Sequence, residues 1–398
     1  MIITIHRGTK QIGGCVTEIK CDQWRLFIDV GDNLPGNDSV LAPIDGLTAG
    51  DGSKSALFLT HYHSDHVGNL DKVLKEIPVY IGITAKEIMM TIAKWAYPEK
   101  LTMMEKINTF TLLEKKEIGP FTVTPLMIDH SAFDAYMFLI DFNGCRILHT
   151  GDFRLHGQRG SKTLKMLTKH AKNVDYVICE GTMLSRDGEQ PTSEFDLQDK
   201  AAKFMKTAPY VFVLCSSTNI DRIGVFYHAN PKGRLFICDK YQKEQLDTIS
   251  EGHAKKSSYY DFKYVYSYAP NLDKLMDEKG FCMLVRKNSN KNNLIKNILD
   301  KYKDKSLVIY SMWKGYLNEK TKDTDICDFL APYRDNHERY KELHTSGHAP
   351  AEDLKRLFET VNPKKGLIPI HSEKPQSFKD FIPEDKLYFL KDRKEFSL

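Results

Sequence analysis

The sequence predicts an α/β protein in which one layered domain is interrupted by a second α/β domain. Three observations support this fold class. Residues 1 to about 175 read as short β-runs with a few helices, residues from about 176 to 340 alternate strands with helices, and the rest returns to short compact elements. With 398 residues, the chain is long enough for two domains of ordinary size.

The first part of the chain carries clear local signals. The apolar run at 56–60, ALFLT, has the length and the flanking residues of a buried strand. The segments 67–77 and 84–97 carry apolar residues at helical spacing, so we expect two helices there. Two strands are expected within 135–150, joined by the Asn-Gly pair 143–144, which is the strongest short signal for a hairpin.

In the middle of the chain, predicted strands and helices alternate. Apolar runs such as DYVICE and YVFVLC are each followed by a helical stretch, which is the pattern of βαβ units around a parallel sheet. Residues after about 340 must supply groups to the site built near the N-terminus, so the middle is an insertion rather than a domain in series. We expect the first domain at 1–178, the insertion at 179–342, and the return to the first domain at 343–398.

Composition narrows the class of protein. No apolar run reaches the roughly 18 residues of a membrane-spanning helix, and the first residues begin a strand rather than a signal segment. A cytoplasmic protein with no membrane partner is therefore expected. The eight cysteines form no CxxC pair, so we expect reduced thiols rather than disulfides or a cysteine–zinc site. The net charge of +4 permits an anionic partner without requiring one.

The segment His61-Tyr62-His63-Ser64-Asp65-His66 is the strongest functional signal. It follows the apolar run at 56–60 directly, at a strand end, where α/β proteins build their sites. Three imidazoles and a carboxylate within six positions form the donor set that zinc favours. With 14 histidines in the chain, such a pattern is expected by chance only about 0.002 times. The alternative, a set of solvated or buried histidines without metal, would need separate partners for each ring.

One such cluster has too few donors to complete the coordination shells of two metal ions, so further ligands are expected elsewhere in the chain. His130, Asp152 and His371 each follow a β-run and could project into the same cleft. Taken singly, each of them is equally well an ordinary loop residue. Together, in this context, they favour a metal site.

These motifs resemble those of a known family. The segments FIDVG with Asp29, HYHSDH, IDH with His130 and HTGDFR with Asp152 resemble the four successive motifs of the metallo-β-lactamase superfamily. Glu180 in YVICEGT, His348 in HTSGHA and His371 in PIHSE resemble the three added motifs of the β-CASP nucleases, a group that includes ribonuclease J, the pre-mRNA 3′-end endonuclease and Artemis-type DNA nucleases. The resemblance implies a metallo-β-lactamase αββα sandwich with an inserted β-CASP α/β domain.

The resemblance also implies how the metals are held. One ion would be bound by His61, His63 and His130, and the second by Asp65, His66 and His371, with Asp152 bridging the two. Asp29 would orient a ligand rather than bind metal. The expected cofactors are two Zn²⁺ ions, with Mn²⁺ as the alternative. His149 and His344 do not match ligand positions and are expected to be structural.

The implied chemistry is hydrolysis of a phosphodiester. Two ions about 3.5–4 Å apart activate a shared water to hydroxide and neutralise charge on the phosphoryl group. The expected catalytic residues are Asp65, Glu180 and His348, with His348 donating a proton to the leaving oxygen while Glu180 orients it. The alternative for Glu180 is an N-cap-like carboxylate in the turn after a strand.

Three residues are expected to contact substrate. Ser346 and Gly347 offer a hydroxyl and unhindered N–H groups to a phosphate oxygen, and Ser217 lies in a polar loop, 216–219, before a helix N-terminus. That second loop is a common type of segment and carries less weight. Arg154 could contact substrate, although an arginine in this position is more often a surface or ion-pair residue.

Within the family, histidine at the last motif accompanies RNA cleavage, so His371 favours a metal-dependent ribonuclease acting on single-stranded RNA, as exonuclease, endonuclease or both. A DNA nuclease of the same family is the first alternative. A small-molecule metallo-hydrolase would not need the insertion, and a non-catalytic nucleic-acid-binding subunit would have lost ligands that are present here. The chain is expected to end just after the catalytic core, and a homodimer is left open.

Overall fold

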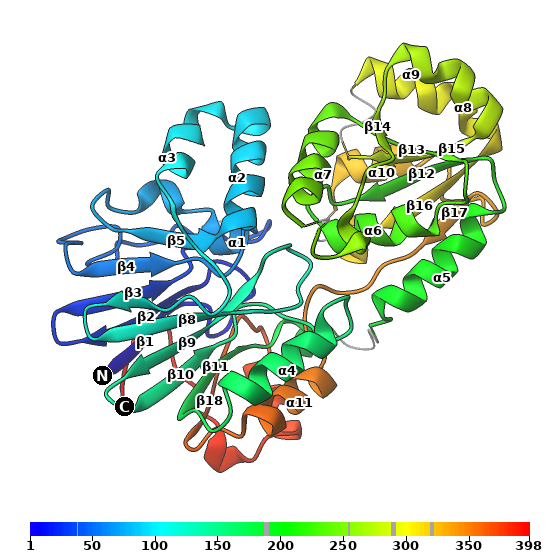
Figure 1. Ribbon diagram of the computed structural model, residues 1–398. Coiled ribbons are helices and arrows are strands. Elements are labelled where there is room, and N and C mark those ends of the chain that lie inside the picture. Colours follow the sequence, from blue (N-terminus) through cyan, green and yellow to red (C-terminus); the bar gives the residue numbers. More distant parts are fainter. Residues whose placement is uncertain (38, 187–190, 254, 288–291, 319–321) are drawn as a thin grey trace. The chain divides into compact units, whose positions relative to one another are not determined.

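The computed structural model describes residues 1–398 except 38, 187–190, 254, 288–291 and 319–321 (Figure 1). It forms two compact units. The first comprises Met1–Pro191 and Gly347–Leu398, and the second comprises Thr192–Ser346. The insertion was expected at 179–342; the second unit begins later because the strand that carries Glu180 pairs within a sheet of the first unit.

The first unit contains two sheets. The first sheet has the order β19-β1-β2-β3-β4-β5-β6. Its strands are β1 (Ile2–Arg7), β2 (Val16–Cys21), β3 (Trp24–Ile28), β4 (Ser55–Phe58), β5 (Val79–Gly82), β6 (Asn108–Phe110) and β19 (Glu395–Ser397). The second sheet has the order β18-β11-β10-β9-β8-β7. Its strands are β7 (Lys116–Ile118), β8 (Phe121–Met127), β9 (Tyr136–Phe142), β10 (Cys145–His149), β11 (Tyr176–Glu180) and β18 (Gly366–Ile370).

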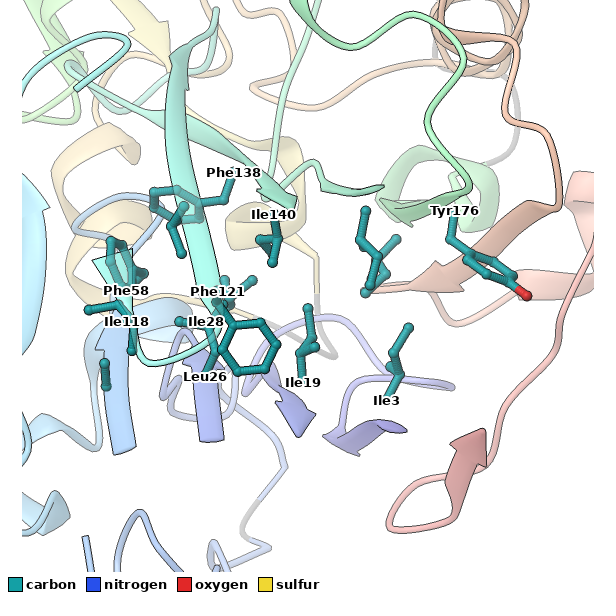
Figure 2. Close-up of a cluster of buried hydrophobic side chains, with 14 of the residues drawn as sticks. Ile3, Ile19, Leu26, Ile28, Phe58, Ile118, Phe121, Phe138, Ile140 and Tyr176 are labelled. Carbon is teal, nitrogen blue, oxygen red and sulfur yellow. The ribbon is translucent and has the colours of Figure 1, made fainter. Parts of the chain in front are cut away.

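The core of the first unit is built by side chains that alternate along these strands. Ile3, Ile19 and Phe58 from the first sheet meet Phe121 and Phe138 from the second in one buried cluster (Figure 2). The opposite face of the second sheet packs against α4 (Gly160–His170) and α11 (Ala351–Val361), as Leu139, Leu167 and Leu357 share a second cluster. The helices α1 (Ser64–Val67), α2 (Ile83–Ala96) and α3 (Leu101–Glu105) belong to the part of the chain that builds the first sheet. The two sheets thus pack face to face, and helices lie outside them, as the predicted αββα layers require.

The predicted hairpin at 143–144 is present. Strands β9 and β10 are antiparallel with Phe142 opposite Cys145, and Asn143 and Gly144 both have positive φ angles, as a two-residue hairpin turn requires. The helix expected at 84–97 corresponds to α2.

The prediction of a helix at 67–77 is wrong. Only the four-residue α1 and a 3₁₀ turn at Leu70–Lys72 form there. The backbone instead bonds to other segments: the Asn69 N–H donates to the Val30 carbonyl and the Leu74 N–H to the Leu47 carbonyl. Tertiary hydrogen bonds thus outweigh the local helical pattern.

The second unit contains one sheet, in which every pairing is parallel, as the strand–helix alternation predicted. Its order is β14-β13-β15-β12-β16-β17, built from β12 (Tyr210–Cys215), β13 (Leu235–Cys238), β14 (Val265–Ser267), β15 (Phe281–Val285), β16 (Ser306–Ser311) and β17 (Tyr340–Glu342). The helices of this unit are α5 (Glu194–Met205), α6 (Ile220–Ala229), α7 (Lys240–His253), α8 (Asp273–Lys279), α9 (Asn293–Tyr302) and α10 (Thr324–Leu330).

A buried ion pair ties the start of the second unit to its end. Arg222 and Glu194 are both fully buried and joined at 2.9 Å. Arg222 also donates to the Ser311 hydroxyl at 2.7 Å and to the Thr345 carbonyl at 3.1 Å. All eight cysteines are free thiols, as expected, and the described helices include none with the length and apolar character needed to cross a membrane.

Candidate metal and catalytic centre

Three histidine nitrogens converge at the ends of β4 and β8. His61 and His63 lie on the loop between β4 and α1, and His130 follows β8. His61 Nε2 and His130 Nε2 lie 3.1 and 3.3 Å from the same atom, His63 Nδ1. These residues, His61, His63 and His130, are called the trio below. The loop that carries His61 and His63 packs against Gly31, which follows β3. This position requires glycine, because any side chain there would collide with the Asp65 carbonyl.

The outer nitrogens of the trio have partners that orient the rings. The His61 Nδ1–H donates to the Thr60 hydroxyl at 3.0 Å, and the His130 Nδ1–H donates to the Gly347 carbonyl at 2.7 Å. In both residues Nε2 is therefore the nitrogen with the lone pair, directed at His63. Burial lowers the pKa of His63 to about 4 and holds the pKa values of His61 and His130 well below the usual range, so the trio is neutral, as metal ligands must be.

A second group of four residues converges beside the trio. It consists of Asp65, His66, Asp152 and His371, called the quartet below, and the candidate ligand atoms all lie within 4.8 Å of one another. His66 Nε2 lies 3.0 Å from Asp152 Oδ2, and His371 Nε2 lies 3.3 Å from Asp65 Oδ2. Asp152 Oδ2 is also 4.0 Å from His61 Nε2, so this carboxylate lies between the two groups.

The quartet concentrates negative charge around its histidines. Burial alone would lower the pKa of His66, but the carboxylates of Asp152, Asp29 and Asp65 outweigh it and hold that pKa well above the usual range. The reverse holds for Asp152, whose pKa is kept well below its usual range by His371, His66 and His348 against the effect of burial. Carboxylates that stabilise a proton on a buried imidazole would equally stabilise a metal cation.

These residues fit metal ions by two tests. Asp152 Oδ1 is buried, and among the described residues it has no hydrogen-bond donor, which is costly for a carboxylate unless a cation satisfies it. The shortest donor separations in the two groups, 3.0–3.3 Å, and the 3.8 Å between His66 Nε2 and Asp65 Oδ2 lie around the edge of a tetrahedron with bonds of about 2.1 Å, which is about 3.4 Å. The nitrogen and carboxylate donors therefore fit a metal site.

Asp29 supports the quartet from outside. Its Oδ2 accepts the His66 Nδ1–H at 2.7 Å and the Thr60 hydroxyl at 2.8 Å, while its Oδ1 accepts the Thr60 N–H at 2.8 Å. Asp29 itself has a φ of 61°, a conformation that a non-glycine residue keeps only when its surroundings hold it there. The carboxylate thus orients ligands on both sides, since Thr60 is also the partner of His61.

Glu180 and His348 meet next to the quartet. Glu180 ends β11, and His348 opens the returning segment of the first unit. The His348 Nδ1–H donates to Glu180 Oε2 at 3.1 Å and lies 3.6 Å from Asp152 Oδ2. The other oxygen, Glu180 Oε1, accepts the Phe153 N–H at 2.9 Å. Glu180 therefore orients His348 and also fixes the backbone next to Asp152. Its Oε2 lies 3.3 Å from the N–H of Thr182 as well, so the capping contact expected as the alternative is present beside the contact to His348.

The expected substrate residues fall in different units. Gly347 lies in the first unit, where its carbonyl orients His130 and where a side chain would collide with the Ser131 hydroxyl. Ser217, in the loop between β12 and α6, and Ser346, the last residue of the second unit, belong to the second unit. Their contact with substrate stays a prediction.

Arg154 is a structural residue rather than a substrate contact. Its side chain is fully buried, and its Nε donates to Asp129 Oδ1 at 2.8 Å. The Arg154 N–H also donates to the Asp129 carbonyl at 2.8 Å. This pair joins the loop of Asp152 to the loop of His130, so it holds two candidate ligands in register. His149 is also structural, with its Nε2 3.2 Å from the Thr17 hydroxyl.

Removing Arg154 should strongly destabilise the first unit. We expect Arg154→Met to lower the free energy of unfolding by about 3–5 kcal/mol, because it leaves the fully buried Asp129 carboxylate without its cation. The exposed pair Lys355–Glu359 provides the control, and Lys355→Ala should cost no more than about 0.5 kcal/mol. Chemical denaturation of the metal-free variants measures both. An Arg154→Met protein as stable as the parent would contradict this role.

Several residues that matter at the site carried no signal in the sequence. Thr60 and Thr182 supply hydroxyl partners to His61 and His371, and Asp129 pairs with Arg154. A hydroxyl partner depends on which distant segment folds beside it, so residue type alone could not identify it. The one hint was position, since Thr60 directly precedes the histidine motif and Thr182 follows Glu180 by two residues.

Two family models match parts of the chain that build the first unit and the candidate site. Residues 35–182 match the family model described as the metallo-beta-lactamase superfamily, and residues 336–382 match the model described as the Zn-dependent metallo-hydrolase RNA specificity domain. Residues 35–182 therefore belong to a metallo-β-lactamase domain, in agreement with the resemblance predicted from the motifs.

The curated relatives are ribonucleases J. The chain is 22% identical over 420 residues to ribonuclease J of Helicobacter pylori strain 26695, covering 98% of this chain and 60% of that protein. It is 21% identical over 390 residues to ribonuclease J of Mycoplasma pneumoniae, covering 92% of this chain and 67% of that protein. The chain thus spans about three fifths of the length of the Helicobacter relatives it matches.

A solved structure shares the fold over the whole chain. It is a protein of unknown function from Enterococcus faecalis V583, with a TM-score of 0.76, 20% sequence identity, and coverage of 100% of this chain and 99% of the other. The fold of this chain is therefore one that an experimental structure already contains.

Proposed function

We propose that this protein is a metal-dependent ribonuclease that hydrolyses the phosphodiester bonds of single-stranded RNA. The observation that carries the proposal is the Glu180–His348 pair, whose Nδ1–Oε2 hydrogen bond of 3.1 Å lies directly beside the quartet. A simple metallo-hydrolase needs the metal ligands alone, whereas a reaction with a poor alkoxide leaving group also needs a proton donor. The relatives named ribonuclease J support RNA as the substrate.

Two divalent ions are proposed, Zn²⁺ or alternatively Mn²⁺, one held by the trio and one by the quartet. Asp152 is proposed as the shared ligand, which is supported by the position of its Oδ2 between His66 Nε2 and His61 Nε2. When bound, the two ions would supply a water nucleophile at neutral pH and neutralise charge on the phosphoryl group. Asp65 is proposed to act both as a ligand and as a catalytic carboxylate beside the nucleophile.

Proton donation and phosphate binding are assigned to residues outside the metal ligands. His348 donates a proton from Nε2 to the leaving oxygen, since its Nδ1 is bonded to Glu180. The Glu180 carboxylate stabilises the protonated imidazole that must be present before that transfer. Ser346 and Ser217 are proposed to bind phosphate oxygens through their hydroxyls, and Gly347 through its backbone N–H, which leaves its carbonyl for His130.

RNA rather than DNA is proposed from two lines of support. His371 occupies the last motif, where the family carries histidine in its RNA-cleaving members, and the RNA specificity domain model matches residues 336–382. DNA cleavage is the alternative that the same assay tests. A cytoplasmic location is part of the proposal, and a homodimer is the oligomeric state we would test first.

The first test is cleavage of 5′-monophosphorylated single-stranded RNA beside its DNA counterpart. We expect loss of RNA with added Zn²⁺ or Mn²⁺, no loss with a chelator, and DNA spared. The product ladder separates exonucleolytic from endonucleolytic cleavage. Metal-loaded protein that cleaves neither substrate would contradict the proposal, and equal cleavage of both would overturn the choice of RNA.

A further inference from the structure

Thr182 makes a set of contacts that neither the sequence motifs nor the proposed mechanism assigns. It is fully buried and begins the 3₁₀ turn Thr182–Ser185 that follows β11. Its hydroxyl oxygen lies 2.7 Å from His371 Nδ1 and 3.3 Å from the His371 carbonyl oxygen. One hydroxyl therefore contacts both the ring and the backbone of a candidate ligand.

The contacts of the ring are compatible with one tautomer of the neutral imidazole, which is the form that binds metal. Its Nε2 lone pair faces the Gly13 N–H at 3.0 Å, and a metal ion bound at Nε2 would take that lone pair in place of Gly13 and lie between the ring and Asp65 Oδ2, which is 3.3 Å away. The proton of this imidazole is then on Nδ1, where it is donated to the Thr182 oxygen. The Thr182 hydroxyl proton is left to donate to the His371 carbonyl, which matches the contact observed there. With Nδ1 bonded in this way, Nε2 is on the side of Asp65.

The backbone of His371 needs the same support. Its φ is 49°, in the left-handed region that non-glycine residues occupy only when several contacts hold them there. The His371 N–H donates to the Gly8 carbonyl at 2.8 Å, while its own carbonyl accepts from Thr182 and, at 3.4 Å, from the Gly181 N–H. Thr182 thus acts on the conformation of the residue as well as on its ring.

Thr182 also contacts the proposed proton-donor pair. The Thr182 N–H lies 3.3 Å from Glu180 Oε2, the oxygen that accepts from His348. The register of β11 against β18 makes this arrangement, because Glu180 lies opposite Ile370, immediately before His371. One residue therefore touches both the quartet and the Glu180–His348 pair.

We propose that Thr182 is a positioning residue whose hydroxyl sets the ring orientation and tautomer of His371, so that Nε2 is presented to a metal ion in the quartet. This inference rests on the proposed metal site, and it extends that site to a residue outside the seven ligands. The hydroxyl, rather than the bulk of the side chain, is the functional part.

The test compares Thr182→Val with Thr182→Ser. Valine keeps the shape of threonine but removes the hydroxyl, whereas serine keeps the hydroxyl and loses a methyl group. We expect Thr182→Val to weaken Zn²⁺ binding at the quartet roughly 10–100-fold, the usual effect of losing a partner that orients a metal-bound histidine. Thr182→Ser should retain most of the affinity, and calorimetric titration with Zn²⁺ alone measures both. If valine binds like the parent, or if serine is weakened as much as valine, the proposal is wrong.

A second readout follows the ring itself. With ¹⁵N-labelled histidine in the zinc-loaded protein, the parent and Thr182→Ser should show a His371 Nδ1–H protected from exchange with solvent, assigned by its loss in His371→Gln. Thr182→Val should lose that protection, and a protected proton retained in Thr182→Val would overturn the proposal. Thr91→Val removes another buried hydroxyl, which donates to the Glu87 carbonyl within α2, and it should change neither readout.

The two proposals fail in different ways. If the protein binds Zn²⁺ but cleaves no RNA, the proposed function fails while the affinities and the His371 signal still decide the role of Thr182. If RNA is cleaved and Thr182→Val behaves like the parent, the proposed function stands and the role of Thr182 is rejected. A thermal melt of each variant shows whether the fold is retained.

Discussion

Asp152→Ala is expected to empty the quartet of metal and to abolish RNA cleavage. Asp152 is buried, its Oδ2 lies between His66 and His61, and its Oδ1 has no hydrogen-bond donor among the described residues. Alanine removes the charge that offsets the positive field of a metal ion and leaves His66 without its nearest carboxylate. The loss of affinity should exceed the roughly 100-fold that follows the loss of a partner outside the ligand set.

Metal content and cleavage should be measured on the same preparation of this variant. Mass spectrometry under native conditions gives the number of ions per chain, and single-stranded RNA gives the rate. Asp141→Ala, which removes a partly exposed carboxylate on β9 with an ion-pair partner of its own, is the control and should retain both. Full activity in Asp152→Ala would exclude the shared-ligand role.

His348→Ala is expected to retain metal but to slow cleavage by about 10²–10⁴-fold, the usual contribution of a general acid. His348 is 17% exposed at its side chain, and its Nδ1 is bonded to Glu180, so its part in the reaction is played by Nε2. Glu180→Gln should slow the reaction in the same direction, because the amide cannot stabilise an imidazolium as a carboxylate does.

A substrate with a better leaving group separates this role from metal binding. An RNA with a phosphorothiolate at the scissile bond needs no proton on departure, so the rate of His348→Ala should approach that of the parent. His348 Nδ1 also lies 3.6 Å from Asp152 Oδ2, and His348 belongs to a further group of candidate ligands with Asp152, Glu180 and His371. Loss of metal in His348→Ala would therefore show that His348 is a metal ligand rather than a general acid. His337→Ala, on the surface of the second unit, is the control.

The ligand set could be predicted because it depends on local sequence. Side chains such as His61 and His130 follow buried strands, β4 of the first sheet and β8 of the second, and this position at strand ends indicated that they could share a cleft. Their division into two metal-binding groups was implied by the family resemblance of the motifs. The parallel sheet of the second unit was predictable for a similar reason, since each apolar run and the helix after it form one local repeat of the chain.

What could not be predicted depends on contacts between distant segments. The helix expected at 67–77 had the correct pattern, but Asn69 and Leu74 bond to residues 30 and 47 instead. Arg154 was ambiguous because only the fold shows Asp129 beside it, and Thr182 was missed because its partner is 189 residues away. The boundary of the insertion was shifted because the pairing of β11 with β18 is invisible in β11 alone.

The pairing of β11 with β18 has a consequence for how the protein is made. A chain growing from its N-terminus acquires the trio and most of the quartet long before His371, and the second unit is synthesised in the interval. Domains generally fold as units during synthesis, so the second unit can be compact before β18 emerges, which shortens the loop that must close. Until then, buried carboxylates such as Asp152 lack a ligand partner. The proposed metal centre of a growing chain would therefore stay incomplete until residue 371 has left the ribosome.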